Sequence, residues 1–208
     1  MRNFQTAVRR TGQAYEMYRG KYILEWDRRS YRLPPLFVMW MKGLKPGDRV
    51  LDLGCGVGQD GRYLLRHRHR VVGVDLTWSF LLRAHQRSRN LPLVQADFHH
   101  LPFQSPVFDG VWAAASLIHC RKPQFPVMLQ QLWSLLKPGG LLGATLRHGS
   151  ESGYLQNQWI PGRYISQWKK PEIQQIFLQT GWTLVHLKMV TNQERKGRWL
   201  NVIARRSR

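Results

Sequence analysis

The 208-residue sequence has few cysteines and no long hydrophobic run. Cys55 and Cys120 stand in dissimilar contexts, which excludes a close-spaced metal or redox motif, and we expect no bound metal. The longest apolar run, Leu36–Met41, is far shorter than the roughly 20 residues that cross a bilayer. The first residues, Met1–Gln5, lack the apolar core of a secretion signal. We therefore expect a cytoplasmic protein with no membrane span.

Acidic residues are also scarce. Twelve Asp and Glu residues stand against 32 Lys and Arg residues, which gives a formal net charge of +20 and a sequence pI of about 11.1. Such a charge attracts polyanions. The basic residues are spread along the chain, however, and no stripe of basic and aromatic residues marks a nucleic-acid surface. RNA binding and a general basic bias both remain as explanations.

The hydrophobic fraction of 43% and the aromatic fraction of 12% are typical of a packed globular protein. The length fits one domain. We expect this single domain, 1–208, to contain four parts: an N-terminal helical lid over 1–48, a ligand-binding core over 49–146, a substrate-side loop over 147–170, and a C-terminal helix and hairpin over 171–208.

Apolar segments alternate with amphipathic ones through the middle of the chain. Strands are predicted at 49–53, 70–74, 91–96, 108–114 and 141–146, and helices at 59–67, 79–87 and 124–136, the last ended by 137–140. This alternation requires a parallel sheet with helices on both faces. The tail predicts a helix over 171–180 and two antiparallel strands, 182–190 and 198–204, joined by a polar turn at 192–197. The expected fold is α/β: a doubly wound, mostly parallel seven-stranded sheet with an antiparallel C-terminal hairpin strand.

A glycine-rich turn follows the first predicted strand. Gly54, Gly56 and Gly58 let the main chain approach a ligand without a Cβ clash. The turn leads into a helix, so its N–H groups face a ligand at the carboxyl edge of the sheet. A dinucleotide fits less well, because the dinucleotide fingerprint has a glycine where Gln59 stands. Asp52 also disfavours a pyrophosphate and favours a cationic ligand.

Two further acids end predicted strands. Asp75 follows the glycine turn by about 20 residues, the spacing at which a carboxylate binds ribose hydroxyls. Asp97, followed by Phe98, ends the next strand in the same manner. Together with the glycine turn, these acids predict a nucleoside-binding site at the carboxyl edge of the sheet.

The segment 54–64, GCGVGQDGRYL, resembles the bacterial branch of the class I, Rossmann-like S-adenosylmethionine-dependent methyltransferases, which carries a GCGxGxDxRYL loop. The likeness continues through 72–75, 111–113, 116–119, 136–140, 162–164 and 197–202. The resemblance implies S-adenosylmethionine as cofactor and S-adenosylhomocysteine as product.

The same resemblance implies roles for single residues. Asp75 should bridge the ribose hydroxyls, and Asp97 should accept a hydrogen bond from the adenine amino group. The other implied contacts are Asp52, Gly54, Cys55 and Gly56 at the methionine end, Leu76 and Phe98 at the adenine, and Ala113 or Ala114 at the methionine ammonium.

A sulfonium methyl group is already activated, so alignment is the main catalytic task. A general base matters only for an acceptor that carries a proton, and His119 and His148 are the candidates by position. Aromatic side chains of the lid and the loop, Tyr22, Tyr154 and Trp159 among them, are expected to exclude water. The residues expected to hold the acceptor are Tyr15, Tyr18, Arg147, Tyr164 and Trp168.

A small-molecule acceptor is the leading hypothesis, since the chain is compact and has no appended RNA-binding module. The alternative is an RNA or tRNA methyltransferase, favoured by the charge of +20. A third interpretation is a non-catalytic protein that binds the cofactor.

Overall fold

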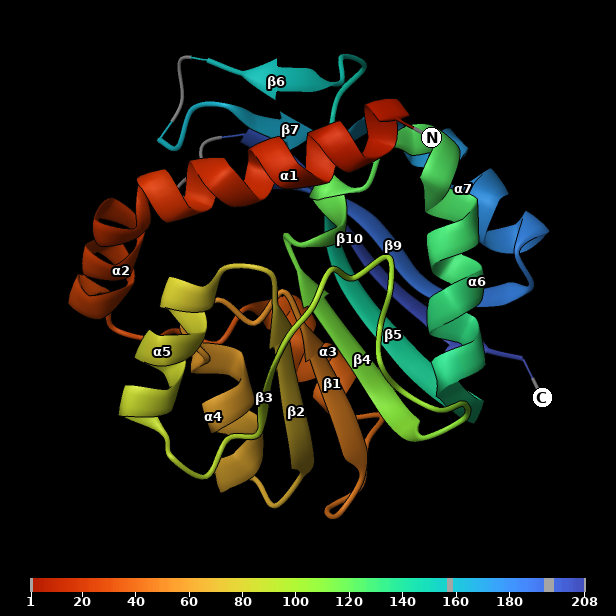
Figure 1. The fold of residues 1–208 in the computed structure, drawn as a ribbon. Coiled ribbons are helices and arrows are strands. Elements are labelled where there is room, and N and C mark those ends of the chain that lie inside the picture. Colours follow the sequence, from red (N-terminus) through yellow and green to blue (C-terminus); the bar gives the residue numbers. More distant parts are fainter. Residues whose placement is uncertain (1, 157–158, 193–196, 208) are drawn as a thin grey trace.

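The computed structural model describes residues 2–156, 159–192 and 197–207 of the chain (Figure 1). A central sheet has the strand order β3-β2-β1-β4-β5-β10-β9, and a two-residue strand, β8, pairs with β5. The first five strands of this order are mutually parallel, whereas β10 runs antiparallel to both β5 and β9. The strands are β1 (Arg49–Leu53), β2 (Arg70–Asp75), β3 (Leu93–Gln95), β4 (Phe108–Ala114), β5 (Leu136–His148), β8 (Gln167–Trp168), β9 (Trp182–Asn192) and β10 (Gly197–Arg206). The predicted fold class is confirmed.

Alternate residues of a strand point to opposite faces, and the sheet separates two hydrophobic cores in this way. In β1, Val50 packs in one core with Trp40, whereas Leu51 packs in the other with Phe125. The first core is covered by α3 (Pro35–Met41) and α4 (Gln59–Arg66), and the second by α6 (Phe125–Leu135) and α7 (Lys170–Gln179). The helix α5 (Trp78–Arg87) contacts β2 and β3.

The N-terminal segment forms α1 (Arg2–Met17) and α2 (Arg19–Arg28). Figure 1 shows α1 lying across the carboxyl ends of the parallel strands, with the hairpin of β6 (Gly153–Leu155) and β7 (Arg163–Ile165) beside it. Two short 3₁₀ turns, η1 (Leu117–His119) and η2 (Lys122–Gln124), connect β4 to α6. The carboxyl edge of the sheet is therefore roofed by segments from both ends of the sequence.

Three predictions need correction. The helix expected to reach 136 ends at Leu135. Residues 137–140 belong to β5, whose first residue, Leu136, pairs with Phe108 of β4. The pairing register of β4 and β5 then shifts between Phe108 and Gly110. The segment 147–170, expected as a loop, contains β6, β7 and β8. The third predicted strand is shorter than 91–96. Of the predicted turn at 192–197, residues 193–196 lie outside the described residues.

Candidate functional site

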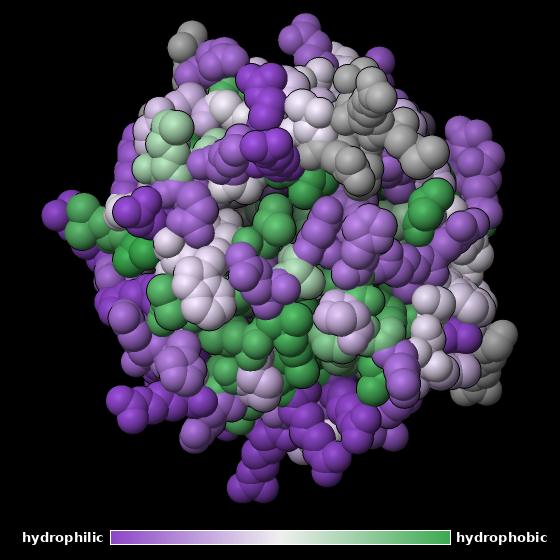
Figure 2. Space-filling view, viewed as in Figure 1, coloured by the Kyte–Doolittle hydropathy of each residue, from purple (hydrophilic) through white to green (hydrophobic). Residues whose placement is uncertain are grey.

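A cavity of about 690 Å³ lies at the carboxyl edge of the sheet. Successive strands contribute one lining residue each at or just past their ends: Gly54, Asp75, Asp97, Ala114 and Arg147. The strand order reverses between β1 and β4, and in open α/β sheets ligands bind at such a point. In the view of Figure 2, hydrophobic residues gather at the centre of the molecule, with hydrophilic residues around them.

The glycine turn brings its main chain to the cavity. Gly54 lines the cavity with φ of 72°, and a Cβ there would overlap the Ser116 side chain. Gly56 has φ of 53°, and a Cβ would lie 2.8 Å from the Tyr22 hydroxyl oxygen. Cys55 packs instead against β2, where burial raises the pKa of its thiol well above the ordinary range. The two glycines thus keep a side-chain-free edge beneath the lid.

Asp75 is hydrogen-bonded to this turn. Its Oδ2 accepts from the Gly56 N–H at 2.9 Å, and its Oδ1 accepts from the Thr77 N–H at 2.8 Å. Burial raises the pKa of Asp75, and these two backbone bonds only partly oppose the rise. The Thr77 hydroxyl and the Leu76 N–H also bind this carboxylate, so ribose hydroxyls would share or displace some of these contacts.

Asp97 lines the cavity beyond Asp75. Its Oδ1 accepts from the His99 N–H at 3.0 Å and lies 2.8 Å from His99 Nδ1. Burial alone would raise the pKa of Asp97, but the bonds from His99 outweigh it, and the pKa is lowered. Leu76 and Phe98 line the cavity next to the two acids, where a flat ring can pack.

Asp52, which the resemblance places at the methionine end of the cofactor, is buried. It is 3% exposed, is not among the described cavity-lining residues, and accepts from the Gly61 N–H at the start of α4. Burial and the nearby Asp60 carboxylate raise the pKa of Asp52 well above its usual range. Asp52 therefore supports the glycine turn from beneath and does not reach into the cavity.

The acceptor side of the cavity contains a chain of polar contacts. His119 Nδ1 lies 2.7 Å from the Tyr164 carbonyl oxygen, and because a carbonyl only accepts, Nδ1 carries the proton. His119 Nε2 then accepts from the Tyr15 hydroxyl at 2.9 Å. Arg163 Nη1 donates to the same hydroxyl at 3.0 Å. Burial lowers the pKa of His119 to about 4, so the ring is neutral at pH 7.

The other residues predicted to contact the acceptor differ in whether they line the cavity. Arg147 lines the cavity and lies over the Trp199 ring. Tyr164 contributes its backbone: its N–H donates to Thr11 Oγ1, and its carbonyl binds His119. Trp168 is 1% exposed and packs on Phe125 in the core, and neither it nor Tyr18 is a described lining residue.

Of the remaining candidates for cofactor contact and for the general base, some line the cavity and others do not. Ala114 lines the cavity, whereas Ala113 is fully buried in the sheet. His148 ends β5 beside Trp168 and is not a described lining residue; burial lowers its pKa. His119 is thus the candidate base that reaches the cavity.

Several lining residues were missed from the sequence. Phe80 of α5 lies between the aromatic rings of the lid, with Tyr22 stacked on it at 4.1 Å. Trp199 enters from β10, far along the chain. Arg163, for which the sequence left open a solvated surface position or a contact with an acidic substrate group, is buried against the cavity. Phe80 and Trp199 reach the site through tertiary packing.

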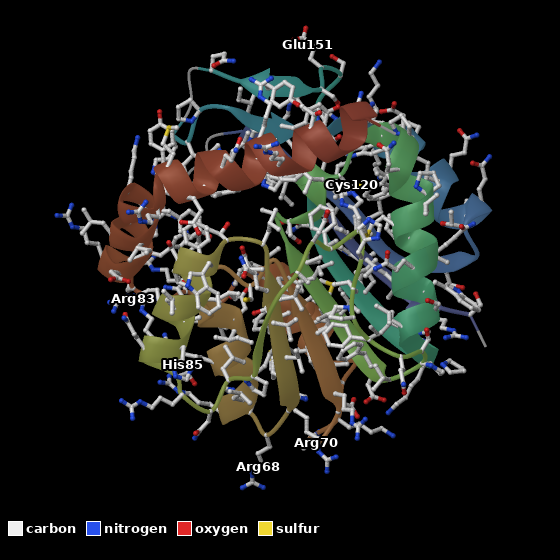
Figure 3. All side chains as sticks on the ribbon, viewed as in Figure 1. Arg68, Arg70, Arg83, His85, Cys120 and Glu151 are labelled. Atoms are coloured by element: carbon white, nitrogen blue, oxygen red, sulfur yellow. The ribbon has the colours of Figure 1, made fainter. Side chains whose placement is uncertain are left out.

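The lid is attached to the core at two further points. Glu16 of α1 accepts from the Ser79 N–H at 3.1 Å and from its hydroxyl at 2.6 Å. Asp27 of α2 binds both Arg83 and Arg87 of α5. Figure 3 places Arg83 on α5 beside α2, and shows Arg68 and Arg70 extending from the end of the molecule opposite α1. These last two charges therefore lie away from the cavity.

Within the described part of the chain, no group of three or more His, Cys, Asp or Glu side chains is arranged to hold a metal ion. None of the described helices combines the length and the apolar character needed to span a membrane.

Residues 50–140 match the family model described as a methyltransferase domain. The chain is 33% identical over 114 residues to a sterol 24-C-methyltransferase from Schizosaccharomyces pombe, a match that covers 51% of this chain and 30% of that protein. It is 34% identical over 111 residues to a malonyl-[acyl-carrier protein] O-methyltransferase from Enterobacter lignolyticus, covering 53% and 43%. The chain thus spans less than half the length of these two curated relatives.

One solved structure is similar over nearly the whole chain. It is a 1,6-didemethyltoxoflavin-N1-methyltransferase from Burkholderia thailandensis, with bound 1,6-didemethyltoxoflavin and S-adenosylhomocysteine. The TM-score is 0.77 at 22% identity, and the match covers 98% of this chain and 89% of that one. At this identity the likeness shows a shared fold.

Proposed function

We propose that residues 50–140, which match the family model described as a methyltransferase domain, form a class I, Rossmann-like methyltransferase domain, and that the protein is an S-adenosylmethionine-dependent methyltransferase acting on a small molecule. The observation that carries the proposal is the cavity at the strand-order reversal, lined by Gly54, Asp75 and Asp97. The relatives named above act on a sterol, a carrier-bound malonyl group and a small heterocycle, which does not favour the RNA alternative.

The residues present fit this cofactor. Asp75 lines the cavity where it would meet the ribose hydroxyls, and Asp97 Oδ2 makes no hydrogen bond with the described residues. Leu76 and Phe98 offer apolar surface for adenine. Gly54 leaves space for the methionine end, since the position has no side chain. Cys55, Gly56 and the Ala114 carbonyl would complete the contacts in the proposed arrangement.

When bound, the sulfonium cofactor supplies an activated methyl group, so the chain itself must orient the acceptor and exclude water. Tyr15, Tyr22 and Trp159 roof the cavity for this purpose. Orientation of this kind is worth about 7–11 kcal/mol of the barrier in favourable cases.

For an acceptor that carries a proton, His119 and Tyr15 form the route by which the proton leaves. The Tyr15 hydroxyl takes the acceptor proton and passes its own to His119 Nε2, to which it is already hydrogen-bonded. With a pKa of about 4, His119 is a weak base. A weak base suffices here, because a hydroxyl or amine becomes strongly acidic as its bond to the methyl group forms.

Calorimetric titration with S-adenosylmethionine, S-adenosylhomocysteine and NADH tests the proposal. We expect saturable binding of both adenosyl ligands and none of NADH. Absence of adenosyl binding would refute the proposal. If methyl transfer occurs only with RNA, and RNA binding weakens steeply as salt rises, the RNA alternative replaces the small-molecule acceptor. Binding with no transfer to any acceptor would favour the non-catalytic interpretation.

A further inference from the structure

Arg163 is a buried cation with uncharged partners. Its side chain lies on β7 at the cavity wall and the residue is 8% exposed. Nε donates to the Ile160 carbonyl oxygen at 2.8 Å, and Nη1 donates to the Tyr15 hydroxyl at 3.0 Å. The guanidinium carbon also lies 5.3 Å from the centre of the Tyr15 ring. Within the described part of the chain, no carboxylate pairs with Arg163.

A buried charge without a counter-charge is costly, and folded proteins pair such groups or leave them where a ligand completes them. The three carboxylates among the described lining residues of the cavity form no ion pair with Arg163. Glu25 binds Arg29, Asp75 binds two backbone N–H groups, and Asp97 binds His99. His119 next to Arg163 is neutral and brings no negative charge.

The position of Arg163 separates it from the proposed cofactor contacts. The acids Asp75 and Asp97 follow β2 and β3, on one side of the strand-order reversal. Arg163 lies with His119 and Arg147, which follow β4 and end β5 on the other side. The cavity is thus acidic over one half and basic over the half left for the acceptor.

We propose that the methyl acceptor is an anion, whose carboxylate or other anionic oxygen group pairs with Arg163 while the atom to be methylated lies at Tyr15 and His119. Arg147 adds a second positive charge at the same end of the cavity. The aromatic walls formed by Tyr15 and Trp199 favour a flat apolar body on this anion. This inference rests on the proposed function and specifies its substrate class.

Matched acid and amide probes test the charge directly. Protein saturated with S-adenosylhomocysteine is titrated with 3-hydroxybenzoate and 3-hydroxybenzamide, with the corresponding 4-hydroxy pair, and with indole-3-carboxylate and indole-3-carboxamide. We expect the acid of at least one pair to bind about tenfold or more tightly than its amide, the ratio that one charge-assisted bond supplies. Equal binding within every pair, or binding of none, would overturn the inference.

Variants of Arg163 assign the preference to this residue. Arg163→Gln should abolish it, and Arg163→Lys should retain part of it, whereas Arg68→Gln, at the opposite end of the molecule, should leave it unchanged. The affinity for S-adenosylhomocysteine should stay the same in all three. A loss of that affinity in Arg163→Gln and Arg163→Lys would mean that Arg163 pairs with the cofactor carboxylate, which overturns the inference.

The thermal midpoint gives a readout that does not depend on any probe. Because Arg163→Gln removes an unpaired buried charge, the midpoint of the ligand-free variant should equal or exceed that of the native protein. A large fall in the thermal midpoint of Arg163→Gln that does not occur in Arg163→Lys would assign Arg163 a structural role and overturn the inference.

The failure of this inference and the failure of the proposed function give different results. If the native protein bound no S-adenosylhomocysteine, the proposed function itself would fail. If it bound S-adenosylhomocysteine but preferred no acid, this inference alone would fail.

Discussion

The two halves of the cavity are built in different ways. The half beside β1, β2 and β3 uses main-chain groups and acids that lie close together in the sequence: Asp75 binds Gly56, 19 residues away, and Thr77, two residues away. The half beside β4 and β5 uses side chains brought together over long separations. Tyr15 and His119 are 104 residues apart, and Tyr15 and Arg163 are 148 apart.

This difference shows which half of the cavity is formed by the sheet alone and which half also needs the segments that lie over it. The parallel sheet alone fixes the acids and the glycine turn, since each follows directly from the end of a strand. The acceptor half exists only when α1 and the β6–β7 hairpin lie over the strands (Figure 1). Substitutions in the first half should therefore change cofactor affinity, and substitutions in the second should change acceptor chemistry.

The largest effect is expected for Asp75→Ala. The substitution removes the proposed ribose contact and leaves the Gly56 and Thr77 N–H groups without their partner. A hydrogen bond to a charged group contributes about 1.5–3 kcal/mol, so the affinity for S-adenosylhomocysteine should fall roughly 10- to 150-fold. Calorimetry measures the change.

Asp109→Asn is the matched control for Asp75→Ala. Asp109 begins β4 at the opposite end of the sheet, where it binds Lys137 and the Arg49 N–H. Its substitution should leave the cofactor affinity unchanged. Unaltered binding by Asp75→Ala would place the adenosyl ligand away from this half of the cavity.

His119 should make the stability of the acceptor half depend on pH. Its pKa is about 4 in the folded protein and near 6.5 when unfolded, so the unfolded chain binds the extra proton between these values. The stability that the neutral ring provides is complete above pH 6.5 and is lost as the pH falls toward 4. The loss should be roughly 2–3 kcal/mol.

Urea unfolding of the native protein and of His119→Gln at pH 7, 5.5 and 4.5 measures this loss. The variant should lose less stability than the native protein over the same range. Parallel curves for the two proteins would show that His119 keeps an ordinary pKa.

The same division explains what could be predicted from the sequence. The strands, the glycine turn and the two acids that end strands follow from local pattern, because strand period and turn residues leave a signal within a few positions. Asp52 carries such a signal, but it is not a described lining residue of the cavity. Its position one residue before the end of β1 directs it toward Gly61 of α4, a packing relation that the motif does not encode.

The acceptor half could be predicted only in part, because its members are brought together by tertiary contact. Tyr15, His119 and Arg147 were candidates and line the cavity, whereas Tyr18 and Trp168 are not described lining residues. Trp168 was expected near the acceptor since the segment 147–170 was taken as a loop. In the structure its strand, β8, pairs with β5, and its ring is held in the core beside Phe125. Arg163, which from the sequence was either a surface arginine or a contact for an acidic substrate group, lies on β7 and donates to the Tyr15 hydroxyl.

Gly54→Ala should have an intermediate effect, confined to the cofactor half. Gly54 has φ of 72°, and the added methyl group would overlap Ser116. Strain of this kind costs about 1–3 kcal/mol. We expect a lower free energy of unfolding together with weaker cofactor binding. Gly20→Ala is the matched control, because no atom lies within 4 Å of a Cβ at that helical position, and it should be neutral or slightly stabilising.

Asp27→Asn should have the smallest effect, and it tests whether the lid opens as a unit. Asp27 binds Arg83 and Arg87 across the contact of α2 with α5. Because such surface pairs contribute about 0–1 kcal/mol, the free energy of unfolding should change by less than that. If the lid must lift for ligand exchange, dissociation of S-adenosylhomocysteine should still quicken a few-fold in stopped-flow fluorescence, and 0.5 M salt should produce the same change in the native protein. An unchanged rate in both experiments would mean that α2 stays on α5 during exchange, and that ligands enter past the β6–β7 hairpin.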